Sequence, residues 1–129
     1  MRDDLFKSHN DIANFRFDES VVEVFDDMVK RSVPGYGSMI QMVGLVARMY
    51  GKDNTNYYDL GSSTGAITLA ISLNNNHKNN KFIAIDNSPD MVKKCQQNLS
   101  KKIDNLEVIC KDINEITIQN ASIVVLNLT

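Results

Sequence analysis

The sequence predicts an α/β fold whose parallel sheet binds a nucleotide-like ligand along one edge. Three observations support this prediction. Short apolar runs alternate with helical patterns in the second half of the chain, as in a parallel sheet with crossover helices. The first run leads through a glycine turn into a helix over residues 57–66, the junction that opens nucleotide-binding α/β units. An acidic or amide side chain also follows the end of each run.

The composition indicates one globular domain without a charge-driven partner. The chain has 129 residues, of which 43% are hydrophobic and 23% are charged. A net charge of −2 gives no general attraction to phosphate backbones or anionic membranes, so we expect neither direct nucleic-acid binding nor a membrane partner.

The cysteines and the apolar segments favour a cytoplasmic protein. Cys95 and Cys110 form no C-x-x-C pair and fit reduced thiols better than a disulfide framework. No apolar run approaches the ~20 residues that span a bilayer, and the N-terminus lacks a signal-peptide pattern. His9 and His77 lie in polar surroundings, so we expect no metal site.

Residues 1–51 are predicted to form an arm and helices that precede the ligand-binding domain. Apolar residues recur at helical spacing over residues 18–31. A second helix is expected to begin at Ser38 as N-cap, with Gln41 completing a capping box, and to end at Gly51.

Residues 52–129 are predicted to form the ligand-binding domain itself. Asn74–Asn80 is polar and of low complexity, which favours a solvated connector. The other elements expected after the strand at 57–60 are a helix over 67–73, a strand over 82–85, a helix from the N-cap Ser88 to about residue 102, and strands over 106–110 and 123–126.

The glycine turn discriminates among ligand classes. A P-loop would place a Lys after its last glycine, but Ala66 follows Gly65. A dinucleotide fold prefers a glycine where Ser63 stands, because the backbone meets a pyrophosphate there. The remaining pattern, Asp59-x-Gly61-x-x-x-Gly65, opens S-adenosylmethionine (SAM) methyltransferases, whose ligand has no phosphate. A surface turn with two glycines is the alternative.

The strand ends supply four candidate ligand contacts, Asp59, Asp86, Asp112 and Asn127, each at or just beyond the end of a strand. Asp86 follows Gly61 by 25 residues, close to the spacing at which an acidic residue binds a ribose, and Asn87 can add a donor. We expect the Asp86 carboxylate to serve the ligand more than the core. Asp112 can accept from an adenine amino group, with the Ile113 N–H on a ring nitrogen.

The remaining contacts concern the reactive part of the ligand. Gly61 and the following backbone would face the methionyl group, and Asn127 would lie beside the reactive methyl. Asn127 is followed by Leu128-Thr129 and not by Pro-Pro and an aromatic residue, which disfavours methylation of base amino groups.

Several longer motifs resemble one family. They are Phe17-Asp18-Glu19, Arg31-Ser32-Val33-Pro34-Gly35-Tyr36, Tyr58-Asp59-Leu60-Gly61, Ala84-Ile85-Asp86-Asn87-Ser88-Pro89 and Val124-Val125-Leu126-Asn127. Together they resemble the carboxy-SAM synthases, which have the Rossmann-like class I SAM-methyltransferase fold. The resemblance implies cofactor contacts by Tyr36, Gly61, Ser62, Ser63, Asp86, Asn87, Asp112, Ile113 and Asn127. The family usually has Cys where Ser62 stands, a change that a backbone contact tolerates.

The resemblance also implies an activity. In that family SAM and prephenate give carboxy-SAM and phenylpyruvate, and a separate enzyme passes the carboxymethyl group to a tRNA wobble uridine. No residue here is typical of a nucleophile, which suits chemistry driven by positioning of the reactants. An ordinary SAM methyltransferase and a non-catalytic nucleotide-binding module remain the alternatives.

The sheet that the sequence predicts is incomplete. Only the first four strands are present, whereas the sheets of this fold are larger, so we expect a fragment from which later strands are absent. The family's arginine for the new carboxylate belongs to that later half. An apolar fourth strand at an open edge favours association, and we expect a homodimer.

Overall fold

The computed structural model describes residues 36–126, and the helix expected over 18–31 lies outside them. The helices are α5 (Tyr36–Tyr50), α6 (Ala66–Asn74) and α7 (Pro89–Leu99), with a short 3-10 helix η1 (Ile113–Glu115). The strands are β1 (Asn56–Leu60), β2 (Lys81–Asp86), β3 (Leu106–Cys110) and β4 (Ala121–Leu126).

The four strands form one parallel sheet, as predicted, in the order β3-β2-β1-β4, which the sequence analysis did not specify. Tyr57 on β1 is in register with Phe82 on β2 and with Ile123 on β4. The chain therefore moves outward from β1 to β3 and then returns to the other side of β1. Ligands of open α/β sheets bind beside such a reversal, outside the carboxyl ends of the strands.

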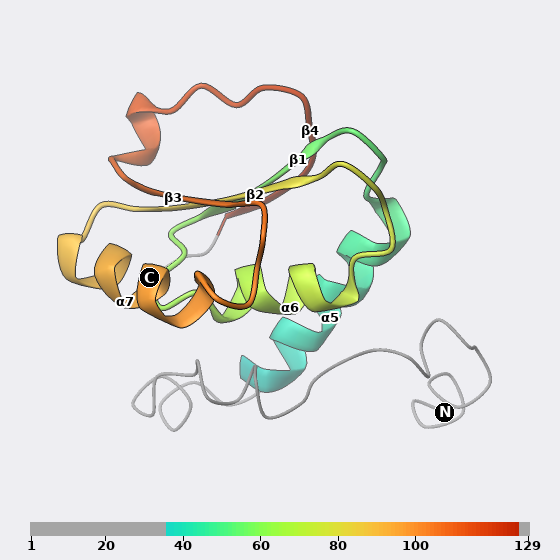
Figure 1. The fold of residues 1–129 in the computed structure, drawn as a ribbon, viewed down its shortest axis with the longest axis horizontal. Coiled ribbons are helices and arrows are strands. Elements are labelled where there is room, and N and C mark those ends of the chain that lie inside the picture. The colour runs from blue at the N-terminus through green and yellow to red at the C-terminus, as the bar shows by residue number, and fades with distance from the viewer. Residues whose placement is uncertain (1–35, 127–129) are drawn as a thin grey trace.

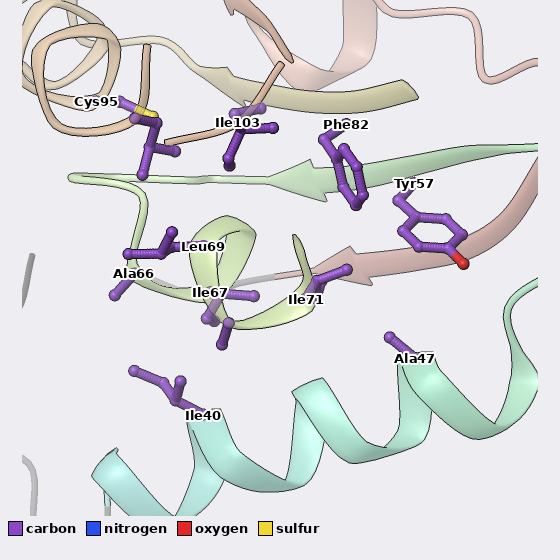
Figure 2. Packing of buried hydrophobic residues seen from close by; sticks show 13 residues of the cluster. Ile40, Ala47, Tyr57, Ala66, Ile67, Leu69, Ile71, Phe82, Cys95 and Ile103 are labelled. Carbon is purple, nitrogen blue, oxygen red and sulfur yellow. The ribbon is translucent and has the colours of Figure 1, made fainter. Parts of the chain in front are cut away.

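The helices α5, α6 and α7 all cover one face of the sheet (Figure 1). The main core lies between these helices and the sheet, and in it Ile40 and Ala47 of α5 approach the apolar side of α6 (Figure 2). Helix α5, which belongs to the predicted N-terminal part, thus packs into the same core as the sheet. Tyr57 and Phe82 meet edge to face with ring centroids 5.2 Å apart.

The segment that joins β3 to β4 runs over the opposite face of the sheet (Figure 1). A smaller apolar cluster lies on this face. No α-helix occurs in this connection, which contains only η1. Ile116 of the connection packs against a cluster formed by Tyr58, Leu60, Ile83 and Ile85. Successive residues of β1 and β2 point to opposite faces of the sheet, and both sets are buried, as expected for parallel strands.

Several predicted boundaries differ from the structure. The described helix α5 already includes Tyr36, so Ser38 lies inside it and the predicted N-cap was wrong. Helix α7 ends at Leu99, about three residues early. Its predicted start is confirmed, because the Ser88 hydroxyl accepts the Met91 N–H at 3.3 Å.

The segment Asn74–Asn80 is not the solvated connector that its composition predicted. Asn80 is buried, and its amide donates to the carbonyls of Lys52 (2.9 Å) and Thr55 (3.0 Å). The amide of Asn75 donates in turn to the Asn80 side-chain oxygen at 3.0 Å. These bonds tie the connection before β2 to the one before β1, so the asparagines fix the start of the sheet.

Strand β4 pairs only with β1 among the described strands, as expected of an edge strand. Val124 and Leu126 expose 46% and 58% of their surface along it. On α5 an apolar stripe is exposed beside this edge, comprising Met39, Met42, Val46, Met49 and Tyr50. Of the helices in residues 36–126, none has the length and apolar content needed to cross a membrane.

Gly65 offers a test of how closely α7 packs on the glycine turn. Its φ of +99° is unfavourable for other residues, and a Cβ there would lie 2.7 Å from Leu99 Cδ1 and 3.0 Å from Cys95 Sγ. We expect Gly65→Ala to lower the free energy of unfolding by about 2–4 kcal/mol, from the backbone cost and the overpacking together. Chemical denaturation measures this loss.

Asn79→Ala is the matched control for this prediction. Asn79 has a φ of 58° and is exposed, so alanine there meets the backbone cost without a buried neighbour. It also loses one side-chain hydrogen bond to Asn54. We expect a loss of about 1–2 kcal/mol, and equal losses in the two variants would show that packing on Gly65 is unimportant.

Candidate functional site

The loop after β1 folds over the end of β2. Gly61 has a φ of +82°, and its N–H donates to the Ile85 carbonyl at 2.7 Å. The Ser62 N–H donates to the same carbonyl at 2.9 Å. Ser63 then takes a φ of +52°, unusual for a residue other than glycine. The backbone over 61–63 is thereby held directly beside Asp86.

The Asp86 carboxylate joins the loops after β1 and β2. Its Oδ2 accepts the Ser63 N–H at 2.9 Å, and its Oδ1 accepts the Ser88 N–H at 2.9 Å. The residue is 8% exposed. The expectation that this carboxylate serves the ligand more than the core was therefore too simple, because it also holds both loops in place.

Helix α7 holds the same loop from its other side. The Asn98 amide donates to the Thr64 carbonyl at 3.0 Å. The Ser63 hydroxyl makes a longer contact of 3.7 Å to the Met91 sulfur. With α7 packed on Gly65, the loop is fixed before any ligand enters, as a preorganised binding site requires.

Asp59 lies beneath this loop and not on its open surface. The carboxylate is 2% exposed, and its Oδ2 accepts a hydrogen bond of 2.6 Å from the Thr68 hydroxyl of α6. Its Oδ1 is buried without a hydrogen-bond partner in the described part of the chain. Burial raises the pKa of this carboxyl to about 6; the charge of Asp86 acts in the same direction, and the bonds from Thr68 oppose it.

Ser62 and Cys95 complete the buried layer under the loop. The Ser62 hydroxyl is buried and has no hydrogen-bond partner within residues 36–126. Burial raises the pKa of the nearby Cys95 thiol to about 12, although Ser62 acts in the opposite direction. Cys95 is therefore a packing residue that stays protonated, not a nucleophile.

The end of β3 adds more open positions. The Lys111 N–H donates to the Asp86 carbonyl at 3.0 Å, which holds the loop after β3 against β2. Asp112 is exposed and its Oδ1 accepts the Asn114 N–H at 2.9 Å, capping η1. Ile113 exposes 42% of its surface and is free to pack on a planar ring.

The structure thus gathers most of the predicted site at one edge. The loop residues Gly61, Ser62 and Ser63 lie against Asp86, and Asn87, Asp112 and Ile113 follow at the adjoining strand ends. Tyr36 lies in the first turn of α5, but its side chain is not among the parts that the structure describes, and neither is Asn127. Within residues 36–126, no three His, Cys, Asp or Glu side chains are placed to hold a metal ion.

Two polar residues of the site were missed in the sequence. Thr68 stands in the otherwise apolar run Ala66–Ile71, and a lone hydroxyl in such a helix could have suggested a buried partner. Asn98 shows no comparable signal, because it lies among the polar residues of a largely exposed helix. Its bond to Thr64 depends on how α7 packs.

Comparison with known proteins assigns the chain to a family. Residues 51–128 match the family model described as a methyltransferase domain. The chain belongs to the methyltransferase domain family. The match covers all four strands and the loop over 61–65.

The resemblance to carboxy-SAM synthases is confirmed along the whole chain. The carboxy-S-adenosyl-L-methionine synthase of Ruthia magnifica subsp. Calyptogena magnifica is 64% identical over 129 residues, which are 100% of this chain and 54% of that protein. The synthase of Shewanella halifaxensis is 47% identical over 98% of this chain and 54% of its own length. The chain thus spans about half the length of these curated relatives.

Solved structures agree on the fold, so the predicted Rossmann-like SAM-methyltransferase architecture is confirmed. An RNA methyltransferase from Salinibacter ruber, in complex with S-adenosyl-L-homocysteine, has a TM-score of 0.55 at 28% identity, covering 71% of this chain and 58% of that one. An O-methyltransferase from Bacillus cereus has a TM-score of 0.58 at 15% identity, covering 74% and 45%. The second likeness concerns the fold alone.

The buried Asp59 predicts a pH-dependent stability in the absence of ligand. Its folded pKa of about 6 lies above the ordinary 3.8, so the folded state binds the proton more tightly than the unfolded state. The resulting stabilisation is present below about pH 4 and is lost as the pH rises through about 6. Its loss costs about 3 kcal/mol by pH 7.

Asp59→Asn should remove this dependence. Between pH 4 and pH 7 the variant should gain about 2–3 kcal/mol of unfolding free energy relative to the wild type, measured by denaturation at each pH. Asp90→Asn, an exposed position in the first turn of α7, is the control and should show no such gain. Parallel stability curves for wild type and Asp59→Asn would contradict the assignment.

Proposed function

We propose that this chain forms the SAM-binding part of a carboxy-SAM synthase, which converts SAM and prephenate to carboxy-SAM and phenylpyruvate. The supporting observation is the 64% identity to a carboxy-SAM synthase over all 129 residues. The hydrogen-bonded loop after β1 is consistent with this proposal. It offers backbone groups and nearby carboxylates, and the described residues place no cationic side chain in the loop.

Each strand end has a role in the proposed complex. Asp86 accepts the ribose hydroxyls, because each carboxylate oxygen keeps a second lone pair beside its bond to a loop amide. Asn87 adds a donor to the ribose. Asp112 and Ile113 hold the adenine, the first through its amino group and the second through its N–H and its exposed side chain.

The methionyl part of SAM would lie along the loop over 61–63. SAM carries a sulfonium and an ammonium against one carboxylate, so a site rich in carboxylates favours it. Asp59 adds negative charge below the loop, and Ser62 and Ser63 contribute backbone groups. Tyr36, implied by the family resemblance, and Asn127, expected beside the reactive methyl, complete the proposed set of cofactor contacts.

The proposed chemistry needs no protein nucleophile. Aromatisation of prephenate to phenylpyruvate expels carbon dioxide and hydroxide, and the hydroxide takes one proton from the SAM methyl group to form water. The carbon of the resulting ylide attacks the carbon dioxide, and the new C–C bond completes carboxy-SAM. The site contributes by holding the reactants together and away from bulk water.

The cellular setting belongs to the same proposal. We infer a cytoplasmic homodimer whose product supplies a carboxymethyl group for tRNA modification through a separate enzyme. The open edge of β4 and the apolar stripe on α5 are the proposed contacts between copies. Light scattering should show concentration-dependent dimers that Val124→Lys disrupts, while Ile118→Lys, equally exposed in the β3–β4 connection, leaves them intact.

Ligand binding and turnover test the proposed function together. In calorimetry the chain should bind SAM and S-adenosylhomocysteine but not NAD. When extended to family length with the remaining part of the Ruthia magnifica relative, it should add the mass of one carbon dioxide to SAM in the presence of prephenate. Methylation of an RNA without prephenate would favour an ordinary methyltransferase, a possibility raised by the Salinibacter ruber likeness. SAM binding without any turnover would favour a non-catalytic module.

Asp86→Asn tests the proposed ribose contact. Loss of two charge-assisted hydrogen bonds should weaken SAM binding by about 2–4 kcal/mol in calorimetry. Since Asp86 also braces the loops, the unfolding free energy of each variant must be measured alongside. Asp90→Asn is the control, and SAM affinity that stays unchanged in Asp86→Asn would remove the residue from the site.

A further inference from the structure

The Asp59 carboxylate is buried without a positive partner. It is 2% exposed and belongs to neither of the ion pairs formed within residues 36–126, which join His77 to Asp53 and Lys81 to Glu107. Isolated buried charges are costly, so such groups are normally paired or neutralised. An ionised Asp59 therefore needs a positive charge from elsewhere.

Thr68 fixes the orientation of this carboxylate. Thr68 is also 2% exposed, and its hydroxyl donates to Oδ2 at 2.6 Å, a usual length for a hydroxyl that donates to a carboxylate. The other oxygen, Oδ1, remains buried and without a partner. The unpaired oxygen thus belongs to a carboxylate held in one orientation, two residues before the glycine turn.

The ionisable groups that face Asp59 are few. Asp86 at the end of β2 adds negative charge, and the Cys95 thiol of α7 stays protonated. Neither can neutralise Asp59. His77 lies at the start of the sheet, paired with Asp53 and the Arg48 carbonyl, and is remote from these strand ends.

We propose that Asp59 is the buried counter-charge for the cationic sulfonium and ammonium of SAM, and that Thr68 is the residue that positions it. This inference rests on the proposed SAM site and adds a coupling between ligand charge and protonation. No direct contact is required, because charges interact strongly through a water-excluded interior. The loop over 61–63 would lie between the Asp59 carboxylate and the cationic groups of SAM, so the two charges would be close but not in contact.

Binding should then expel a proton from Asp59. The ammonium and carboxylate of SAM keep their charges between pH 5 and pH 7, so Asp59 is the group that changes. With a pKa of about 6 in the free protein, SAM affinity should fall about tenfold from pH 7 to pH 5. The reciprocal effect is proton release on binding, seen by calorimetry in buffers of different ionisation enthalpy.

A neutral ligand separates this effect from the ribose contact. 5′-Methylthioadenosine keeps the adenine and ribose of SAM but has neither the sulfonium nor the ammonium. Its affinity should hardly change across this pH range, whereas any disturbance of the proposed ribose contact at Asp86 would weaken the binding of both ligands. Asp59→Asn should make SAM binding as independent of pH as that of methylthioadenosine.

Two substitutions of Thr68 test its positioning role. Thr68→Val keeps the shape but removes the hydroxyl, so the midpoint of the SAM pH profile should move upward and SAM should bind several-fold more weakly at pH 6. Thr68→Ser keeps the donor and should retain the wild-type profile. Methylthioadenosine binding should be unchanged in both variants, which also shows that they are folded.

The outcomes separate this inference from the proposed function. If the wild type binds neither SAM nor methylthioadenosine, the proposed function fails. If it binds both ligands with the same pH profile, the function stands and the counter-charge inference is wrong. An unchanged profile in Thr68→Val would remove Thr68 from the positioning role, and Asp59→Asn still tests the counter-charge if Thr68→Val does not fold.

Discussion

The double hydrogen bond of the Asp86 carboxylate is the interaction on which the site depends. One oxygen accepts the Ser63 N–H and the other the Ser88 N–H, so a single side chain joins the loops after two neighbouring strands. Without it, the left-handed backbone of Ser63 would lose its anchor. The same group is the proposed ribose acceptor, and the ligand would therefore bind a carboxylate that the fold has already oriented. One residue would thus both hold the two loops in place and bind the ribose.

The features predicted correctly from the sequence are those that a few neighbouring residues determine. The glycine turn, the Ser88 cap and the alternation of strands and helices are each set by a few adjacent residues, and the structure has them. The parts that were missed depend on distant packing. Asn80 is a buried anchor because the connections before β1 and β2 lie side by side, which its polar neighbours in sequence do not reveal. Asp59 looked like an open ligand contact, but α6 and its Thr68 cover it.

The strand order explains how a chain of about half the relatives' length can contain most of the proposed ligand contacts. Strands β1, β2 and β3 place their carboxyl ends side by side, and β4 returns to the far side of β1 (Figure 1). The groups proposed for ribose, adenine and methionine thus come from consecutive connections. The side of the sheet beyond β4 is different, because its exposed Val124 and Leu126 show an apolar edge without a described partner.

A structure of the chain with S-adenosylhomocysteine would show whether Asp86 both holds the loops and binds the ribose. We predict the ribose hydroxyls within hydrogen-bond distance of Asp86 while the bonds from Ser63 and Ser88 persist. The adenine should lie against Ile113 and the amino-acid part along residues 61–63. A ligand bound elsewhere, or an Asp86 that keeps only its two loop bonds while the ribose lies away from it, would contradict the account.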